Sequence, residues 1–209
     1  MHDKTPPDTS LAEGEPAWEV ATLFPNQGDW SVEDYLALDT RRLVEFTDGY
    51  IEILPMPTEA HQLILIFLFD ALRAFVRPRN LGLPLLSPFR VRLSERKFRE
   101  PDVIFMFARH AKRRRNRFWE GADLVMEIVS EDDPKRDFVT KRRDYAIAGI
   151  PEYWIVDPQR KEITVLQRVG DRYEVHGVFK PRQKATSVLL PGFAVSISAV
   201  FKAAEAAGE

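Results

Sequence analysis

The sequence contains no cysteine, so disulfide bonds and thiolate metal sites are both excluded. It also lacks a long hydrophobic segment. Its longest strongly apolar run, Leu63 to Phe69, is far shorter than the roughly 20 residues that span a bilayer. The first residues are polar and include several prolines, without the apolar stretch of a signal peptide. We therefore expect a cytoplasmic protein with no membrane contact.

The net charge is also small, at −2 over 209 residues, so the composition does not predict a strong, sequence-independent binder of nucleic acid. A nuclease is not excluded, because such enzymes gather acidic groups at a metal and basic groups around the rim. The length fits one domain with its own core. Residues 1–28 carry many prolines and acids. They are predicted to form a flexible leader before a single domain at residues 29–205.

The chain shows well-marked helix and strand patterns. Asp48-Gly49 between two apolar runs predicts a tight hairpin in which Glu45 lies opposite Glu52, and these two carboxylates need a nearby metal cation or arginine. Helices are predicted after Ser31, at 58–77 and at 134–148. Strands are expected at 85–93, 102–107, 123–129, 152–156, 162–168, 172–179 and 186–189. From residue 58 the order of helix, three strands, helix and strand predicts an α/β domain with a mixed sheet.

Two acidic residues lie in segments that are otherwise apolar. Glu127 falls inside the strand at 123–129, where an ionised carboxylate costs several kcal/mol unless it binds a metal or pairs with a buried arginine or lysine. Asp102 opens the apolar strand at 102–107, although Pro-Asp alone is typical of a turn or strand start. If these strands are neighbours, the two carboxylates supply oxygen ligands of the kind that Mg²⁺ prefers.

The helix at 134–148 adds a basic group to this pair. Lys141 recurs at three- and four-residue spacing with Phe138, Tyr145 and Ala148, so it lies on the apolar stripe that faces the sheet. Such a lysine either covers apolar surface with its stem while its ammonium reaches water, or points toward the acids at the strand ends. Spacing alone leaves both interpretations open.

Several segments resemble the Uma2 family, also called DUF820. The resemblance covers residues 30–202 and is most specific at Gly149-Ile-Pro-Glu-Tyr-Trp-Ile-Val-Asp157. Further matching segments are Val44-Glu-Phe-Thr-Asp-Gly49, Pro57-Thr-Glu-Ala-His-Gln62, Leu124-Val-Met-Glu-Ile-Val-Ser130, Asp137-Phe-Val-Thr-Lys-Arg-Arg-Asp-Tyr145 and Leu190-Pro-Gly-Phe193. That family is similar in fold to restriction endonucleases. The resemblance therefore implies a restriction-endonuclease-like core, a mixed β-sheet flanked by helices, with an N-terminal hairpin.

The resemblance also implies an activity, that of a metal-dependent endonuclease hydrolysing phosphodiester bonds, with DNA as the expected substrate. Asp102 and Glu127 would bind Mg²⁺ or Mn²⁺, and Lys141 would position water or stabilise developing charge. In the D/E-x-K motif that is usual in the wider nuclease superfamily, the lysine would lie at position 129, which is Val129 in this sequence. The lysine is therefore expected to come from the following helix. Glu45 would add a metal ligand or orient water.

Other residues are candidates for contact with the substrate. His61 would contact phosphate or donate a proton, or serve the structure alone. Arg99 and a basic run that includes Arg113, Arg114 and Arg115 would follow a nucleic-acid backbone, unless the run is simply a solvated loop. A small domain reaches one strand of a duplex, which favours a homodimer. The alternatives are a degenerate nuclease-fold module that binds nucleic acid or a protein partner, and a hydrolase of another phosphate ester.

Overall fold

The hairpin predicted from Asp48 and Gly49 is present in the computed structural model, which describes residues 24–205 and 207. Strands β1 (Val44–Thr47) and β2 (Tyr50–Ile53) pair with Glu45 opposite Glu52, which confirms the predicted register. The φ angle of Gly49 is +93°, and a Cβ there would lie 2.2 Å from the Gly28 carbonyl oxygen. Residues 1–23 of the predicted leader lie outside the described residues, whereas Gly28 at its end already packs on the hairpin.

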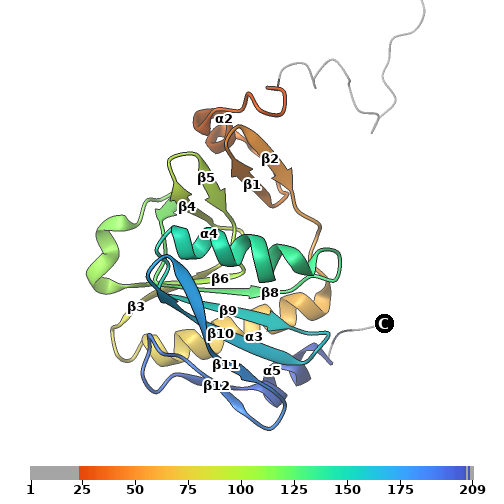
Figure 1. Cartoon of the computed structure of the whole chain (residues 1–209), viewed down its shortest axis with the longest axis vertical. Helices are drawn as coiled ribbons and strands as arrows, with labels where there is room; N and C mark the ends of the chain where they lie inside the picture. Colours follow the sequence, from red (N-terminus) through yellow and green to blue (C-terminus); the bar gives the residue numbers. More distant parts are fainter. Residues whose placement is uncertain (1–23, 206, 208–209) are drawn as a thin grey trace, which may run out of the picture.

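A six-stranded mixed sheet forms the centre of the structure (Figure 1). Strands β8 and β9 run parallel, and the other neighbours run antiparallel. Helix α3 (Glu59–Val76), three of these strands, a helix over residues 134–147 and β9 follow one another along the chain, with strands of a second sheet inserted among them. This order confirms the predicted core. Across the sheet lie β11 (Arg172–Phe179), β10 (Glu162–Val169), β9 (Glu152–Asp157), β8 (Leu124–Ile128), β6 (Val103–Phe107) and β3 (Gly82–Leu86).

Helices cover both faces of this sheet. Helix α3 and the terminal helix α5 (Ile197–Ala204) pack on one face, and the helix over residues 134–147 crosses the other (Figure 1). That second helix begins with two α-helical residues, continues as the π-helical segment η2 (Arg136–Lys141) and ends as α4 (Arg142–Ile147). Alternate residues of β8 enter opposite cores, with Leu124 and Met126 on the α3 side and Val125 on the α4 side. The strand is therefore buried on both faces, as its sequence predicts.

A second sheet brings the hairpin next to the central one. Helix α2 (Val32–Ala37) packs on it through Tyr35, whose ring lies 5.2 Å from that of Phe46 and 5.3 Å from that of Phe98. The sheet carries Glu45 and Arg99 toward the end of the central sheet where Asp102 lies. Its strand order is β2, β1, β5 (Lys97–Arg99), β4 (Arg90–Ser94) and β7 (Phe118–Glu120).

Some predicted boundaries are wrong. The single strand expected at 85–93 is two strands, β3 and β4, that belong to different sheets. Residues 87–89 lie between the two strands and outside both ladders, and the proline at position 88 has no N–H to donate there. Strands β5 and β7 have three residues each, which is too short for a periodic pattern to predict them. The strand expected at 186–189 is β12 (Lys184–Thr186), which pairs with β13 (Ala194–Ser196), and the basic run begins as the 3₁₀ helix η1 (Ala108–Arg113).

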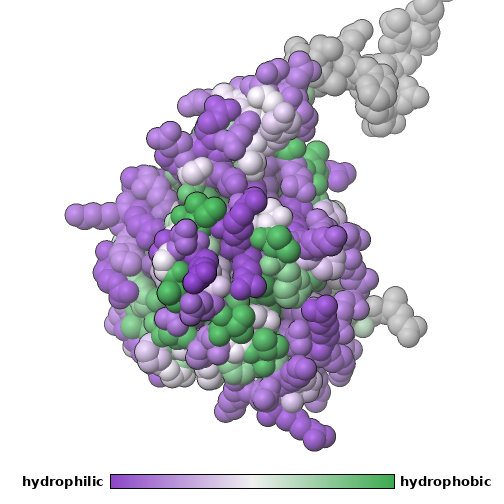
Figure 2. Space-filling model, viewed as in Figure 1, coloured by the Kyte–Doolittle hydropathy of each residue, from purple (hydrophilic) through white to green (hydrophobic). Residues whose placement is uncertain are grey.

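The outer face of α4 and the β10–β11 hairpin is mixed in character. Figure 2 shows hydrophobic side chains among hydrophilic ones in this region. The exposed hydrophobic residues include Val139 and Ile147 on the helix and Val169, Val175 and Val178 on the hairpin. Among the described residues, no helix combines the length and the hydrophobicity needed to cross a bilayer.

Candidate active site

Asp102 and Glu127 meet at one end of neighbouring strands. Asp102 immediately precedes β6, and Glu127 lies near the end of the antiparallel β8. The Ile128 N–H donates to Asp102 Oδ2 at 2.7 Å, and the Asp102 N–H donates to Glu127 Oε2 at 3.4 Å. Both side chains are buried, with Asp102 8% and Glu127 2% exposed. The structure thus brings together the two carboxylates that the sequence nominated as metal ligands.

Lys141 points at these acids and not at water. Its Nζ lies 3.0 Å from Glu127 Oε1, 3.2 Å from Asp137 Oδ1 and 4.0 Å from Glu45 Oε1. Lys141 is 5% exposed, whereas Val139 and Ile147 of the same helix are 63% and 67% exposed. A helix that buries a lysine and exposes two aliphatic residues reverses the usual distribution. Of the two orientations that the sequence left open, the structure has the inward one.

The sequence interpretation missed two further groups of this cluster. The Tyr145 hydroxyl donates to Glu127 Oε1, the oxygen that Lys141 also contacts. Asp137 is buried against Lys141, one π-helical turn earlier in the chain. Both residues lie four positions from Lys141, so the spacing along the helix was the available signal. The position of Tyr145 on the apolar stripe predicts packing of its ring and carries no signal for the partner of its hydroxyl.

Glu45 is held mainly by arginines. Its Oε2 lies 3.0 Å from Arg136 Nη2 and 3.4 Å from Arg99 Nε. Arg136 Nη2 also lies 2.9 Å from Glu52 Oε2, so an arginine joins the two facing carboxylates of the hairpin. Arg99 is itself buried, and its Nη2 donates to Asp144 Oδ2 at 2.8 Å. The catalytic role predicted for Glu45 and the substrate contact predicted for Arg99 stay predictions.

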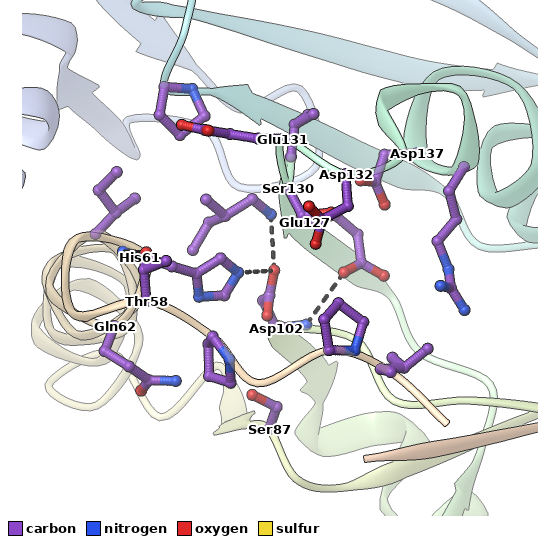
Figure 3. A pocket seen from close by; sticks show the side chains of 18 of the residues that line it. Thr58, His61, Gln62, Ser87, Asp102, Glu127, Ser130, Glu131, Asp132 and Asp137 are labelled. Atoms are coloured by element: carbon purple, nitrogen blue, oxygen red, sulfur yellow. Dashed lines mark hydrogen bonds and ion pairs between the residues drawn. The ribbon is translucent and has the colours of Figure 1, made fainter. Parts of the chain in front are cut away.

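His61 contacts Asp102 from the side that faces away from Glu127. Its Nε2 lies 3.3 Å from Asp102 Oδ2, and Figure 3 shows Asp102 between His61 and Glu127. The side chain of Thr58 accepts a hydrogen bond from the His61 N–H, which places His61 in the first turn of α3. The buried His61 Nδ1 has no hydrogen-bond partner among the described residues. His61 is therefore placed to orient Asp102, and its predicted contact with substrate stays a prediction.

The predicted basic run lies at the opposite end of β6 and β8. It follows Phe107, the last residue of β6, whereas Asp102 precedes the first. Arg113 Nε donates to the Glu120 carbonyl oxygen at 2.7 Å, and Arg115 Nη2 lies 3.1 Å from Glu120 Oε1. The predicted substrate contacts of Arg113, Arg114 and Arg115 are therefore separated from the carboxylate pair by the length of the strands.

Burial and unequal charge govern the protonation of the cluster. Burial, together with the charges of Asp102 and Asp137, raises the pKa of Glu127 above its ordinary value of 4.5, against the opposing effects of Lys141 and the Tyr145 hydroxyl. Burial alone would lower the pKa of Lys141, but the charges of Glu127 and the neighbouring acids outweigh it and raise that pKa above its ordinary value of 10.5. Lys141 is therefore charged at neutral pH. Because nearby negative charge raises the pKa of Glu127, a divalent cation bound beside it would favour the ionised carboxylate.

These groups line a cavity of about 250 Å³. Asp102, Glu127 and Lys141 are among its lining residues, and an apolar wall that includes Leu54 and Met56 also borders it. Within residues 24–205 and 207, no cluster of three or more His, Cys, Asp or Glu side chains is arranged to hold a metal ion. Two carboxylates fit Mg²⁺ nevertheless, because this ion commonly keeps several waters and binds through one or two carboxylates.

A central mixed sheet with two acids at neighbouring strand ends and a buried lysine beside them defines a nuclease-fold protein. The chain belongs to the Uma2 family, described as "Putative restriction endonuclease", whose profile matches residues 32–198. A crystal structure described as that of "a putative nuclease belonging to DUF820 from Anabaena variabilis" has a similar fold, with a TM-score of 0.69 at 20% identity, over 82% of this chain and 97% of that one. The curated proteins include no match. Family and fold together suggest a nuclease.

Proposed function

We propose that the protein is a divalent-metal-dependent endonuclease that hydrolyses phosphodiester bonds of nucleic acid, with DNA as the substrate. The observation that carries the proposal is the buried cluster of Asp102, Glu127 and Lys141, in which the Lys141 ammonium lies 3.0 Å from Glu127. Restriction-endonuclease-like families generally use divalent metals. Mg²⁺ and Mn²⁺ are the ions proposed for this site, and the cytoplasm and a homodimer remain the expected location and assembly.

Asp102 and Glu127 are the proposed metal ligands. A bound divalent cation supplies positive charge next to the reacting phosphate and a water of lowered pKa. The Ile128 N–H and His61 both contact Asp102 Oδ2, so that oxygen is fixed in direction. Tyr145 fixes Glu127 in the same way from the opposite core. Because both carboxylates are held by neighbouring groups, they need little reorganisation to bind the ion.

Lys141 acts as a charged donor and not as a base. Its raised pKa keeps the ammonium protonated at neutral pH, so it does not accept the proton of an attacking water. Its N–H groups are available to the phosphate oxygens that gain charge as the phosphodiester is attacked, or to the water that attacks. The neighbouring Asp137 and Glu127 hold the ammonium on the cavity side of the helix.

The non-catalytic alternative predicts a different site. A degenerate module would be expected to turn Lys141 away or to place an arginine between the two carboxylates. In the part of the chain that the structure describes, Lys141 faces Glu127, and the arginines of the region pair with Glu45, Glu52 and Asp144. These contacts support the catalytic interpretation.

The test is a cleavage assay with plasmid DNA, single-stranded DNA and RNA in Mg²⁺, Mn²⁺ or EDTA. The wild-type chain is compared with Lys141→Ala and with Lys112→Ala, which removes an exposed lysine from η1. Cleavage that needs metal, is lost in Lys141→Ala and is kept in Lys112→Ala is the expected result. Absence of cleavage by the wild type on every substrate would favour the binding module. Equal activity of the two variants would remove Lys141 from the mechanism.

A further inference from the structure

A second hollow adjoins the cavity and shares a wall with it. Val129, Ser130 and Gln159 line both spaces. The hollow measures about 320 Å³ and is formed by the start of the helix over residues 134–147 and the turn between β9 and β10. Figure 3 shows Ser130 on the segment that leaves β8 beside the carboxylate pair. A polymeric substrate with one monomer in the cavity therefore has this hollow available for its next monomer.

The floor of this hollow is apolar and includes an aromatic ring. Phe138 is half-buried and Val139 is 63% exposed, so their side chains are accessible from the hollow. The guanidinium of Arg160 lies 5.7 Å from the centre of the Phe138 ring. Aromatic rings with nearby arginines are the surfaces on which proteins stack unpaired bases without regard to sequence.

The charges of the two spaces are complementary to a single strand. Lys135 and Arg160 are exposed at the hollow, and Arg160 lies 3.8 Å from the carboxylate of the buried Asp157. The Asp157 carboxylate also accepts a hydrogen bond from the backbone N–H of Arg160 at 3.0 Å. The cations of the cavity are buried and paired with acids, so a metal held by Asp102 and Glu127 would supply the positive charge for a phosphate there. The hollow offers exposed cations that bind phosphate directly.

We propose that this hollow is a subsite for the nucleotide next to the scissile phosphate, in a single-stranded or locally unpaired polynucleotide. The base packs on Phe138 and Val139, and its phosphate is contacted by Lys135 and Arg160. A base held in this way is not paired with a complementary strand, so the subsite favours single strands over duplex. The inference rests on the proposed function, because it assumes a polynucleotide substrate.

The test measures binding separately from cleavage. Fluorescence anisotropy with the full-length chain in Ca²⁺ follows a labelled oligothymidylate, an oligouridylate of equal length and a duplex of equal length. Lys135→Gln/Arg160→Gln is compared with Arg73→Gln/Arg77→Gln, which removes two positive charges at the C-terminal end of α3, the end away from His61. Arg73 is a matched control because its side chain is 55% exposed and ion-paired, as that of Arg160 is at 66% exposure.

The subsite variant is expected to bind single strands about tenfold more weakly and to lower the salt dependence of log K by about 0.7, the value for the one phosphate that both cations contact. The control is expected to bind as the wild type does. Phe138→Leu keeps an apolar side chain but removes the ring, and it is expected to weaken binding by about fivefold or more. Single strands are expected to bind more tightly than the duplex.

Equal losses in the two double variants, no loss in the subsite variant, or no binding by the wild type would overturn the subsite. Cleavage distinguishes this failure from that of the proposed function. Binding that depends on Lys135 and Arg160 in a wild type that cuts nothing would keep the subsite and reject the nuclease. Cleavage that is unchanged in the subsite variant, with unchanged binding, would keep the nuclease and reject the subsite.

Discussion

Strand β8 has a buried carboxylate at each of its two ends, and the protein holds them differently. Asp123, just before the strand, accepts the Phe107 N–H at 2.7 Å and contacts the His110 ring nitrogen at 2.8 Å and Arg113 at 3.8 Å. Glu127, near the other end, shares Lys141 with further acids. Burial of an acid is common to both ends, so burial alone does not identify a functional group. The partners differ, since Asp123 meets His110 and Arg113 whereas Glu127 shares the Lys141 ammonium with Asp137 and Glu45, and this difference is the basis for proposing a metal at the Glu127 end.

The largest expected effect separates these two ends by activity. Asp102→Ala and Glu127→Gln are expected to lower the cleavage rate by about 10³-fold, because each removes a proposed ligand of a metal ion whose charge would lower the barrier by several kcal/mol. Asp123→Asn is expected to leave the rate of the folded protein unchanged and to lower the free energy of unfolding by about 1–3 kcal/mol. Cleavage rates and urea unfolding measure the two effects. A similar loss of rate in all variants would contradict the distinction.

Lys141→Ala is expected to lower the cleavage rate by about 10²-fold, since it removes one charged donor from the site. The same change is expected to leave metal affinity equal or stronger, because it removes a positive charge that repels the cation. Rates measured against Mg²⁺ concentration separate the two quantities. Recovery of full activity at high Mg²⁺ would show that Lys141 serves metal binding and not the chemical step.

Tyr145→Phe is expected to have a smaller effect, about tenfold on rate, because its hydroxyl orients a ligand without touching the reacting groups. The hydroxyl lowers the pKa of Glu127, so its removal raises that pKa further. The acid limb of the pH–rate profile should then move to higher pH. A lower rate with an unmoved profile would indicate that Tyr145 only fills space.

The smallest expected effect concerns stability without divalent cations. The pKa of Glu127 is raised in the folded protein, so between 4.5 and the raised value the folded state holds more protons than the unfolded state. The free energy of unfolding therefore falls as pH increases through this range. Glu127→Gln is expected to flatten the fall by roughly 1 kcal/mol or more. Urea midpoints at several pH values measure it, and an unchanged slope in the variant would argue against the raised pKa.

Much of the fold and the centre of the site could be predicted from the sequence. Asp48-Gly49 fixed the hairpin register, and the helix and strand patterns specified the core order. Asp102 and Glu127 were predictable as a pair because each is an acid in an apolar strand. A metal ion bound by both carboxylates would offset the cost of burying them. Helical spacing placed Lys141 on the apolar stripe but left its orientation open, and the family resemblance indicated that it points toward the acids.

The remaining features depend on strand direction and on contacts between distant segments. The basic run follows the end of β6 opposite Asp102, so its distance from the site required the antiparallel pairing of β6 with β8. Arg136 forms ion pairs with both Glu45 and Glu52, although it lies 84 positions after Glu52 in the sequence. No local sequence pattern predicts such a contact. Tyr145 was recognised as apolar although its hydroxyl contacts Glu127. The short strands β5 and β7 form by pairing with neighbouring strands, and their own residues do not predict them.

The most direct test of the central claim is a measurement of Mn²⁺ binding by electron paramagnetic resonance, with Mg²⁺ as competitor. The wild type is expected to bind one Mn²⁺ that Mg²⁺ displaces. Glu127→Gln is expected to lose this binding, and Asp123→Asn is expected to retain it. Absence of Mn²⁺ binding by the wild type, or equal binding by both variants, would contradict the assignment of the acid-rich end of β8 as a metal site.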